Sequence, residues 1–287
     1  MKKTPAVYVG MSEGMTDQIR SFMVAYCFWK KHPEYKFILD LSKFKNRDKE
    51  LKKQQKNKNY KPLSNFGHIV FSLDYFKIKE HMPYTTTTVS PLKIFWLKIT
   101  KRYSAGWKNS YDVVNWLKRG VKKDVYIFHK SYSTQIENIP MCFSEISDMF
   151  ELSAPPPTAS NALFIKKIQS SACPVCMHVR RGDAWAGYKN AEYLYEKINQ
   201  LKKQLKNIKL DIFVFSNDLK WCEENLKNFK GVKFTFVDAN SESEPYFELD
   251  LMKRCKHFIL TSGQFGKLAY VLCKNTDKKI VSDLILP

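Results

Sequence analysis

The sequence lacks any apolar run long enough to cross a membrane, which takes about 18 to 20 consecutive residues. Its first residues, MKKTPAVYVG, include Pro5 and too short an apolar segment for a secretory signal. The seven cysteines are odd in number and scattered, which is typical of reduced thiols and excludes a regular disulfide framework. We therefore expect a soluble protein that is not exported and that acts in the cytoplasm.

The sequence also lacks a convincing set of metal ligands. Cys173 and Cys176 form a C-x-x-C pair with His178 close behind, but no second such pair could complete a zinc site. The one tripeptide similar to a D-x-D metal motif, residues 248–250, is predicted to open a helix with no glycine loop around it. We therefore predict no bound metal and interpret Cys173 and Cys176 as buried strand residues.

Acidic residues are scarce beside basic ones. The chain has 28 Asp and Glu against 48 Lys and Arg, which gives a formal net charge of +20. Such a charge attracts phosphate in nucleic acids, anionic lipids or nucleotides. No helix-turn-helix signal, zinc finger or aromatic RNA motif is present, so the sequence disfavours a nucleic-acid binder. A nucleotide ligand and peripheral contact with an anionic inner membrane stay open.

What is present is a globular composition, with 44% hydrophobic and 14% aromatic residues. A run of three prolines within residues 152–162 indicates a linker, because prolines cannot continue a helix or join a sheet interior. We expect an N-terminal α/β domain over residues 1–152 and a C-terminal domain over residues 161–287. In the first, strands at residues 6–9 and 35–41 flank a helix; residues 60–150 predict no topology.

The C-terminal part alternates between short apolar segments and segments with helical spacing. Strands are expected at residues 173–179, 210–216 and 232–237, with helices at 190–209 and 218–229, and the alternation continues to the end of the chain. Alternating strands and helices form a doubly wound, mostly parallel sheet. Ligands of such sheets bind outside the carboxyl ends of the strands.

Two adjacent arginines, Arg180 and Arg181, follow the first of these strands. Side chains of neighbouring residues at a strand end point to opposite faces, so one arginine can face an anionic ligand while the other braces the loop. Asp183 can hold one guanidinium, and Gly182 permits a tight turn. A solvated surface loop with a local Arg–Asp pair is the alternative.

A second candidate anion site lies between a strand and a helix near the end of the chain. Thr261, Ser262, Gly263 and Gln264 would present hydroxyls and backbone N–H groups to a phosphate at the start of the helix. An ordinary strand-to-helix turn is the alternative, because the segment matches neither G-x-G-x-x-G nor the P-loop.

Two further sets of polar residues have a structural and a functional interpretation. Asp218 is a good helix N-cap, while Ser216 or Asn217 before it could face a ligand. Either Glu248 or Asp250 could accept hydrogen bonds from the N1–H and 2-amino groups of guanine. They could equally belong to a first helical turn that the helix dipole favours.

Together these stretches resemble the α-1,2-fucosyltransferases of glycosyltransferase family 11. The matching segments are HVRRGD at residues 178–183, FSNDLKWCEEN at 215–225 and CKHFILTSGQFG at 255–266, which includes Phe265. Residues 14–19, GMTDQI, are similar to the family's G-x-G-N-Q-M loop but carry Thr16 and Asp17 for its second glycine and its asparagine. Lys267 and Leu268 stand where the family usually has two tryptophans.

The resemblance implies a GT-B-like α/β fold of two Rossmann-like, doubly wound domains facing a cleft. It places GDP-fucose on the C-terminal domain and an oligosaccharide or glycolipid acceptor on the N-terminal side. The implied reaction is metal-independent and inverting: L-fucose moves to a hydroxyl of a terminal galactoside in α-1,2 linkage. Another linkage, such as α-1,6, is the alternative, and synthesis of a surface polysaccharide such as O-antigen would fit a cytoplasmic enzyme.

The resemblance also suggests roles for residues. Arg180 would be the main group that stabilises the leaving β-phosphate, with His178 assisting and Asp183 orienting. The expected donor-binding residues are Arg181, Ser216, Asn217, Glu248, Asp250, Thr261, Ser262, Gly263, Gln264 and Phe265. Gly14, Asp17 and Gln18 would contribute from the N-terminal loop, where Glu13 or Asp17 is a candidate general base.

Overall fold

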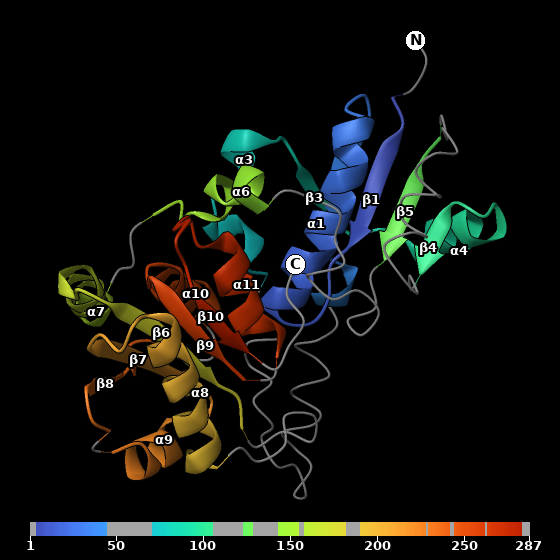
Figure 1. Ribbon diagram of the computed structural model, residues 1–287. Coiled ribbons are helices and arrows are strands. Elements are labelled where there is room, and N and C mark those ends of the chain that lie inside the picture. The colour runs from blue at the N-terminus through green and yellow to red at the C-terminus, as the bar shows by residue number, and fades with distance from the viewer. Residues whose placement is uncertain are drawn as a thin grey trace, which may run out of the picture. The chain divides into compact units, whose positions relative to one another are not determined.

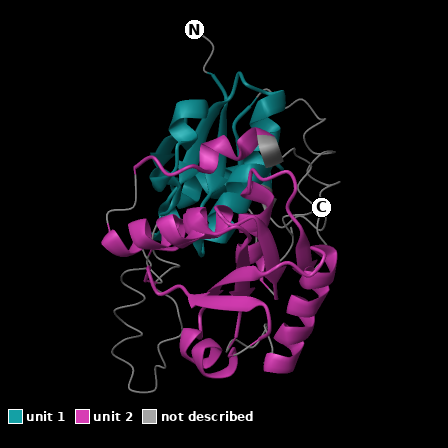
Figure 2. Cartoon of the chain, turned by 60° about the vertical axis from the view of Figure 1, so that its left-hand side comes forward, with its two compact units in different colours: residues 1–142 teal, residues 143–287 magenta. Residues whose placement is uncertain are grey.

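The computed structural model describes most of the chain in two compact units, residues 1–142 and 143–287 (Figure 2). Within the described residues, each unit contains a five-stranded sheet whose paired strands run parallel, with helices packed against it (Figure 1). The described ranges are 4–44, 71–105, 123–128, 143–154, 158–181, 190–227, 229–241, 244–261 and 263–282.

The first unit has its sheet in the order β3-β2-β1-β5-β4, so that β1 is central. Its elements are β1 (Ala6–Gly10), α1 (Met15–Lys31), β2 (Lys36–Asp40), η2 (Leu73–Tyr75), α3 (Ile78–His81), β3 (Thr85–Thr87), α4 (Pro91–Ile99), β4 (Tyr103–Ala105) and β5 (Val125–Phe128). The sequence predicted β1, α1 and β2, and these are confirmed. Helix α1 packs against β1, and its side chains Ile19, Phe22 and Met23 are fully buried.

The second unit has the strand order β10-β9-β6-β7-β8. Its elements are α6 (Phe143–Ile146), η4 (Asp148–Phe150), α7 (Ala159–Ser170), β6 (Pro174–Val179), α8 (Ala191–Gln204), β7 (Leu210–Ser216), α9 (Leu219–Asn225), β8 (Val232–Phe236), α10 (Pro245–Lys253), β9 (His257–Leu260), α11 (Gln264–Leu272) and β10 (Ile280–Ser282). The predicted alternation of strand and helix is confirmed, and the doubly wound order follows from it: β7 and β8 extend the sheet to one side of β6, and β9 and β10 to the other.

In the central strand β6, apolar residues follow one another in the sequence and do not alternate with polar ones. All six of its residues are buried, because helices cover both faces of a doubly wound parallel sheet. Cys173 and Cys176 are buried in this region as the sequence predicted, and all six cysteines within the described residues are free and buried. Burial raises the pKa of the Cys176 thiol well above its usual value, so it stays protonated.

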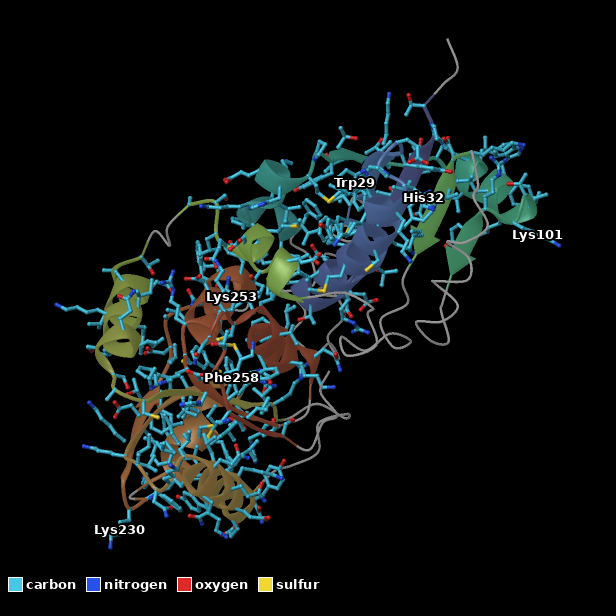
Figure 3. The ribbon with its side chains drawn as sticks, turned by 45° about the horizontal axis from the view of Figure 1, so that its top comes forward. Trp29, His32, Lys101, Lys230, Lys253 and Phe258 are labelled. Carbon is cyan, nitrogen blue, oxygen red and sulfur yellow. The ribbon has the colours of Figure 1, made fainter. Side chains whose placement is uncertain are left out.

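The two units divide after Cys142, whereas the sequence suggested a boundary at the proline run, whose residues 155–157 lie outside the described ranges. A buried lysine joins residues before that run to the second unit. Lys253 on α10 (Figure 3) donates a hydrogen bond to the Phe150 carbonyl at 2.6 Å and lies 3.7 Å from a carboxylate oxygen of Glu151. Burial lowers the Lys253 pKa, and Glu151 opposes this effect.

None of the described helices has the length and apolar character that a membrane crossing requires.

Candidate functional site

The candidate site lies at the carboxyl end of β6, the middle strand of the second sheet. The chain leaves β6 as Arg180 and Arg181, between the ends of β7 and β9. Because the sheet grows in opposite directions on either side of β6, the ends of β6 and β9 form its topological switch point, where doubly wound folds bind ligands.

On the β9 side, Thr261 makes hydrogen bonds to the backbone at the end of β6. Its hydroxyl accepts a hydrogen bond from the Arg180 backbone N–H at 3.0 Å and donates to the His178 carbonyl at 3.2 Å. The Thr261 backbone N–H also donates to that carbonyl at 3.2 Å. Thr261 is 1% exposed, so its hydroxyl bonds to the protein's own backbone and is shielded from solvent.

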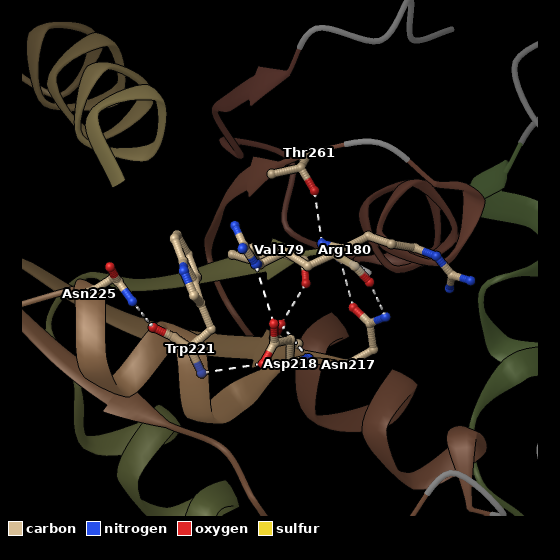
Figure 4. A network of polar contacts seen from close by, with 9 residues as sticks. Val179, Arg180, Asn217, Asp218, Trp221, Asn225 and Thr261 are labelled. Carbon is tan, nitrogen blue, oxygen red and sulfur yellow. Dashed lines mark hydrogen bonds and ion pairs between the residues drawn. The ribbon is translucent and has the colours of Figure 1, made fainter. Parts of the chain in front are cut away.

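On the β7 side, two residues predicted to bind a ligand also hold backbone (Figure 4). The Ser216 hydroxyl donates to the Val179 carbonyl at 2.7 Å. Asn217 accepts from the Arg181 backbone N–H at 2.8 Å, and its amide donates to the Arg181 carbonyl. Backbone groups just beyond a strand end have no ladder partner, and these side chains satisfy them.

The Arg181 side chain turns toward α9 and is buried. Its guanidinium carbon lies 3.4 Å from the centre of the Trp221 ring, and its Nε lies 3.4 Å from an Asp218 carboxylate oxygen. Asp218 also accepts from the Trp221 backbone N–H at 3.3 Å, which confirms it as the N-cap of α9. Asp218, which the sequence suggested only as a cap, therefore links the start of α9 to Arg181.

The Arg180 side chain takes the other direction, extending away from Trp221 (Figure 4). Its Cδ lies 3.3 Å from where a Cβ on Gly263 would be, so the side chain runs beside the start of α11. Gly263 has φ of +109°, a conformation that strongly favours glycine. Arg180 is half-buried, and its side chain passes the residue that precedes α11, a nine-residue helix.

His178 is buried behind Arg180 and is neutral at physiological pH. Burial, with a smaller contribution from the Arg180 charge, lowers its pKa to about 4. Its Nδ1 is the one buried side-chain nitrogen or oxygen without a hydrogen-bond partner in the described part of the chain. The ring meets Phe265 edge-on, with centroids 5.7 Å apart.

Gly266 allows α11 to approach His178. A Cβ there would lie 3.0 Å from His178 Nδ1 and 2.9 Å from Leu260 Cδ2, closer than van der Waals contact permits. The absence of a side chain at Gly266 therefore sets the distance between α11 and the end of β6.

The two carboxylates on α10, Asp250 and Glu248, differ in how exposed they are to solvent. Asp250 is 2% exposed and accepts from Arg254 Nε at 2.8 Å, so its charge is already paired. Glu248 is half-buried on the same helix. Of the two, Glu248 is the more accessible to a ligand.

Of the residues predicted in the N-terminal loop of the first unit, Gly14 lies between β1 and α1, whereas Asp17 and Gln18 lie at the start of α1 itself. Gly14 is the N-cap of α1, and Glu13 before it has φ of +65°. Gln18 is fully buried: its amide donates to the Glu13 carbonyl at 3.1 Å and accepts from the Ser72 N–H at 2.9 Å. Asp17 pairs with Arg20 at 2.9 Å.

Two predicted site residues, Asp183 and Ser262, lie outside the described residues, as does Gly182. Within the described ranges, no group of three or more His, Cys, Asp or Glu residues is arranged to hold a metal ion.

The roles of Trp221 and Gly266 were not predicted from the sequence. The signal for Trp221 was present, since Asp218 and Trp221 are three residues apart at a helix start and so share a face. For Gly266 no local signal existed, because its partners Leu260 and His178 come from two different strands.

Two α/β units, each built on a five-stranded parallel sheet, are typical of a GT-B-like fold, and the second unit carries a basic pair at its switch point. A model of glycosyl transferase family 11 matches residues 128–283, more than half of the chain. The chain belongs to this family.

The most similar curated relatives include galactoside alpha-(1,2)-fucosyltransferase 1 of Alouatta belzebul, 32% identical over 122 residues. That match covers 39% of this chain but 32% of the relative, so the chain spans about a third of the relative's length.

Solved structures show the same fold. POFUT1 in complex with GDP matches with a TM-score of 0.52 at 11% identity, covering 99% of this chain and 100% of that one. NodZ alpha-1,6-fucosyltransferase soaked with GDP-fucose matches with a TM-score of 0.51 at 12% identity, covering 94% and 93%. The GT-B-like fold expected from the sequence is confirmed.

Proposed function

We propose that the chain is a GDP-fucose-dependent fucosyltransferase that moves L-fucose, with inversion, to a hydroxyl of a terminal galactoside in α-1,2 linkage. The observation that carries this proposal is the position of Arg180, at the switch point of the second sheet and beside the start of α11. Family membership and the GDP-fucose and GDP of the structural neighbours support the choice of donor.

The proposed reaction needs positive charge beside the phosphate that leaves the sugar. As the bond between fucose C1 and the phosphate oxygen breaks, negative charge grows on the β-phosphate. The Arg180 guanidinium and the N–H groups at the start of α11 would stabilise that charge, in the way an oxyanion site does. These groups supply fixed positive potential from the protein itself, and we infer that transfer does not need a metal ion.

The surrounding residues would act mainly by positioning. Thr261, Ser216 and Asn217 hold the backbone of the arginine pair, and the neutral His178 ring would support Arg180 and α11 by packing. Arg181 would contribute to donor binding in two ways: by its positive charge and by helping to hold the backbone of the arginine pair in place.

Other residues would contact the remaining parts of the donor and the acceptor. We assign Glu248 to the guanine, with Asp250 behind it, and Gly263, Gln264, Phe265 and Ser262 to the diphosphate and sugar. Asp183 would orient an arginine. The first unit would bind the acceptor, with Gly14 and Gln18 shaping its loop. Because Asp17 is already paired with Arg20, we propose Glu13 as the general base.

The donor assignment is tested by thermal shift with GDP, GDP-fucose, UDP and a UDP-sugar. A ligand at 100 times its dissociation constant stabilises by about 2.7 kcal/mol. We expect GDP and GDP-fucose to stabilise the protein and the uridine nucleotides to leave its melting temperature unchanged. Equal shifts with GDP and UDP would refute the guanine assignment.

The reaction is tested by incubating GDP-fucose with lactose, a type 1 disaccharide or a core glycan, and analysing linkage and anomeric configuration. We expect an α-1,2 product on the galactosides, at an undiminished rate in excess EDTA. Transfer only to the core glycan would show a different linkage, and loss of activity in EDTA with rescue by Mn²⁺ would refute the metal-free mechanism.

We propose that the reaction occurs in the cytoplasm, in synthesis of a surface polysaccharide such as O-antigen, because the six cysteines among the described residues are buried and free, as in a reducing environment.

A further inference from the structure

Helix α4 of the first unit presents an apolar face to solvent. Leu92, Phe95, Trp96 and Ile99 are 81%, 62%, 53% and 63% exposed. Their spacing of three, one and three residues places all four on one side of the helix. Single exposed apolar residues are ordinary, but four on one face form a patch of the kind that marks a binding surface.

The opposite face of α4 fixes the helix to its sheet. Leu97 is fully buried and packs in a cluster with Val89 and Tyr126. The Lys93 ammonium lies 3.0 Å from an Asp124 carboxylate oxygen and 4.0 Å from the centre of the Tyr8 ring. The outer apolar side chains are therefore held outward by a well-anchored helix.

Basic side chains border the exposed face at the C-terminal end of α4. The Arg102 guanidinium carbon lies 4.0 Å from the centre of the Trp96 ring. Lys98 lies on α4 itself, and Lys101, just after its end, projects outward (Figure 3). The sequence from 85 to 111 contains no aspartate or glutamate. Exposed apolar side chains with cations beside them match the chemistry of an anionic lipid surface.

We propose that α4 docks the protein on an anionic membrane surface, independently of the proposed transferase activity. Leu92, Phe95, Trp96 and Ile99 would enter the boundary between headgroups and acyl chains, while Lys98, Lys101 and Arg102 would lie among the phosphates. A second copy of the chain fits this face poorly, because pairing would bring two basic rims together in a protein with a net charge of +20.

The test is flotation with vesicles of phosphatidylcholine alone or with about a third phosphatidylglycerol. The wild-type protein should float with the anionic vesicles, weakly with the neutral ones, and less as salt is raised. The double variant Phe95→Gln/Ile99→Gln should bind anionic vesicles at least about tenfold more weakly, since it removes half of the apolar face. Lys98→Gln and Lys101→Gln should each cost about fivefold.

A matched control uses exposed apolar residues of the second unit. Leu163 and Ile208 are 51% and 46% exposed, so Leu163→Gln/Ile208→Gln makes the same chemical change elsewhere and should bind vesicles like wild type. All variants should keep the wild-type melting temperature and GDP response, which separates docking from donor binding.

Equal vesicle binding by wild type and Phe95→Gln/Ile99→Gln would overturn the proposal, as would equal losses in the control variant. A concentration-dependent dimer in sedimentation, abolished by Phe95→Gln/Ile99→Gln and accompanied by no vesicle binding, would also overturn it and assign the face to a second copy.

Discussion

A lysine substitution at Arg181 should mainly lower stability, whereas the same substitution at Arg180 should mainly lower turnover. The Arg181 guanidinium is buried against Trp221 at 3.4 Å, and a desolvated stack of this kind contributes about 2 kcal/mol. The ion pair with Asp218, whose side chain is 41% exposed, adds less than about 1 kcal/mol. Lysine has no planar group to stack, so Arg181→Lys should destabilise the second unit by about 2 kcal/mol.

Arg180→Lys should instead spare stability and remove turnover. The side chain is half-buried beside α11, so its replacement should change stability by less than about 0.5 kcal/mol. Lysine keeps the charge but cannot hold two phosphate oxygens in a fork. Loss of one such contact in the transition state costs about 3 to 4 kcal/mol, or 10²- to 10³-fold in kcat.

The assay combines thermal unfolding with kcat at saturating GDP-fucose. We expect a fall of about 4 to 8 °C in Tm for Arg181→Lys, with a milder kcat defect than in Arg180→Lys. The comparison uses kcat because a group acting on the departing phosphate affects turnover more than donor affinity. Near-normal kcat in Arg180→Lys, or a larger kcat defect in Arg181→Lys, would refute these roles.

Three further results follow from the same contacts. A double-mutant cycle with Arg181→Met and Trp221→Leu should show about 1 to 2 kcal/mol of coupling in urea unfolding, and additive losses would disprove the stack. Gly266→Ala should cost about 1 to 3 kcal/mol and weaken GDP binding in titration calorimetry, because its Cβ would meet His178 and Leu260 within 3.0 Å; unchanged affinity would show that α11 does not set the site. His178 has a folded pKa of about 4 against 6.5 when unfolded, so unfolding takes up a proton and stability is lost as pH falls from 6.5 toward 4. Between pH 7 and pH 4.5 this loss is about 2 to 3 kcal/mol, and it should be absent from His178→Gln; equal pH dependence of Tm in both proteins would contradict the buried neutral ring.

The strands and helices of the second unit could be predicted because their signals are local. β7 spans the residues 210–216 that the apolar run indicated, and Asp218 caps α9 as its position before a helical pattern predicted. Such features depend on residues a few positions apart.

What the sequence could not show were contacts between strands. Ser216 and Thr261 looked like ligand-binding hydroxyls, but both bond to the backbone at the end of β6, and this becomes visible only when β7 and β9 are known to flank it. The exposed face of α4 was hidden for a similar reason: a single sequence does not tell which side of an apolar helix its sheet covers.

The hydrogen bonds from Thr261, Ser216 and Asn217 bear on how the site moves. They hold the two residues after β6 on both sides, at a point where a chain leaving a sheet would ordinarily fray. The conformational entropy of this strand end is therefore lost when the unit folds and not again when a ligand arrives. Amide hydrogens of Arg180 and Arg181 should exchange with solvent as slowly as those inside β6, with or without nucleotide, so ligand-dependent ordering is confined to parts of the site beyond the arginine backbone.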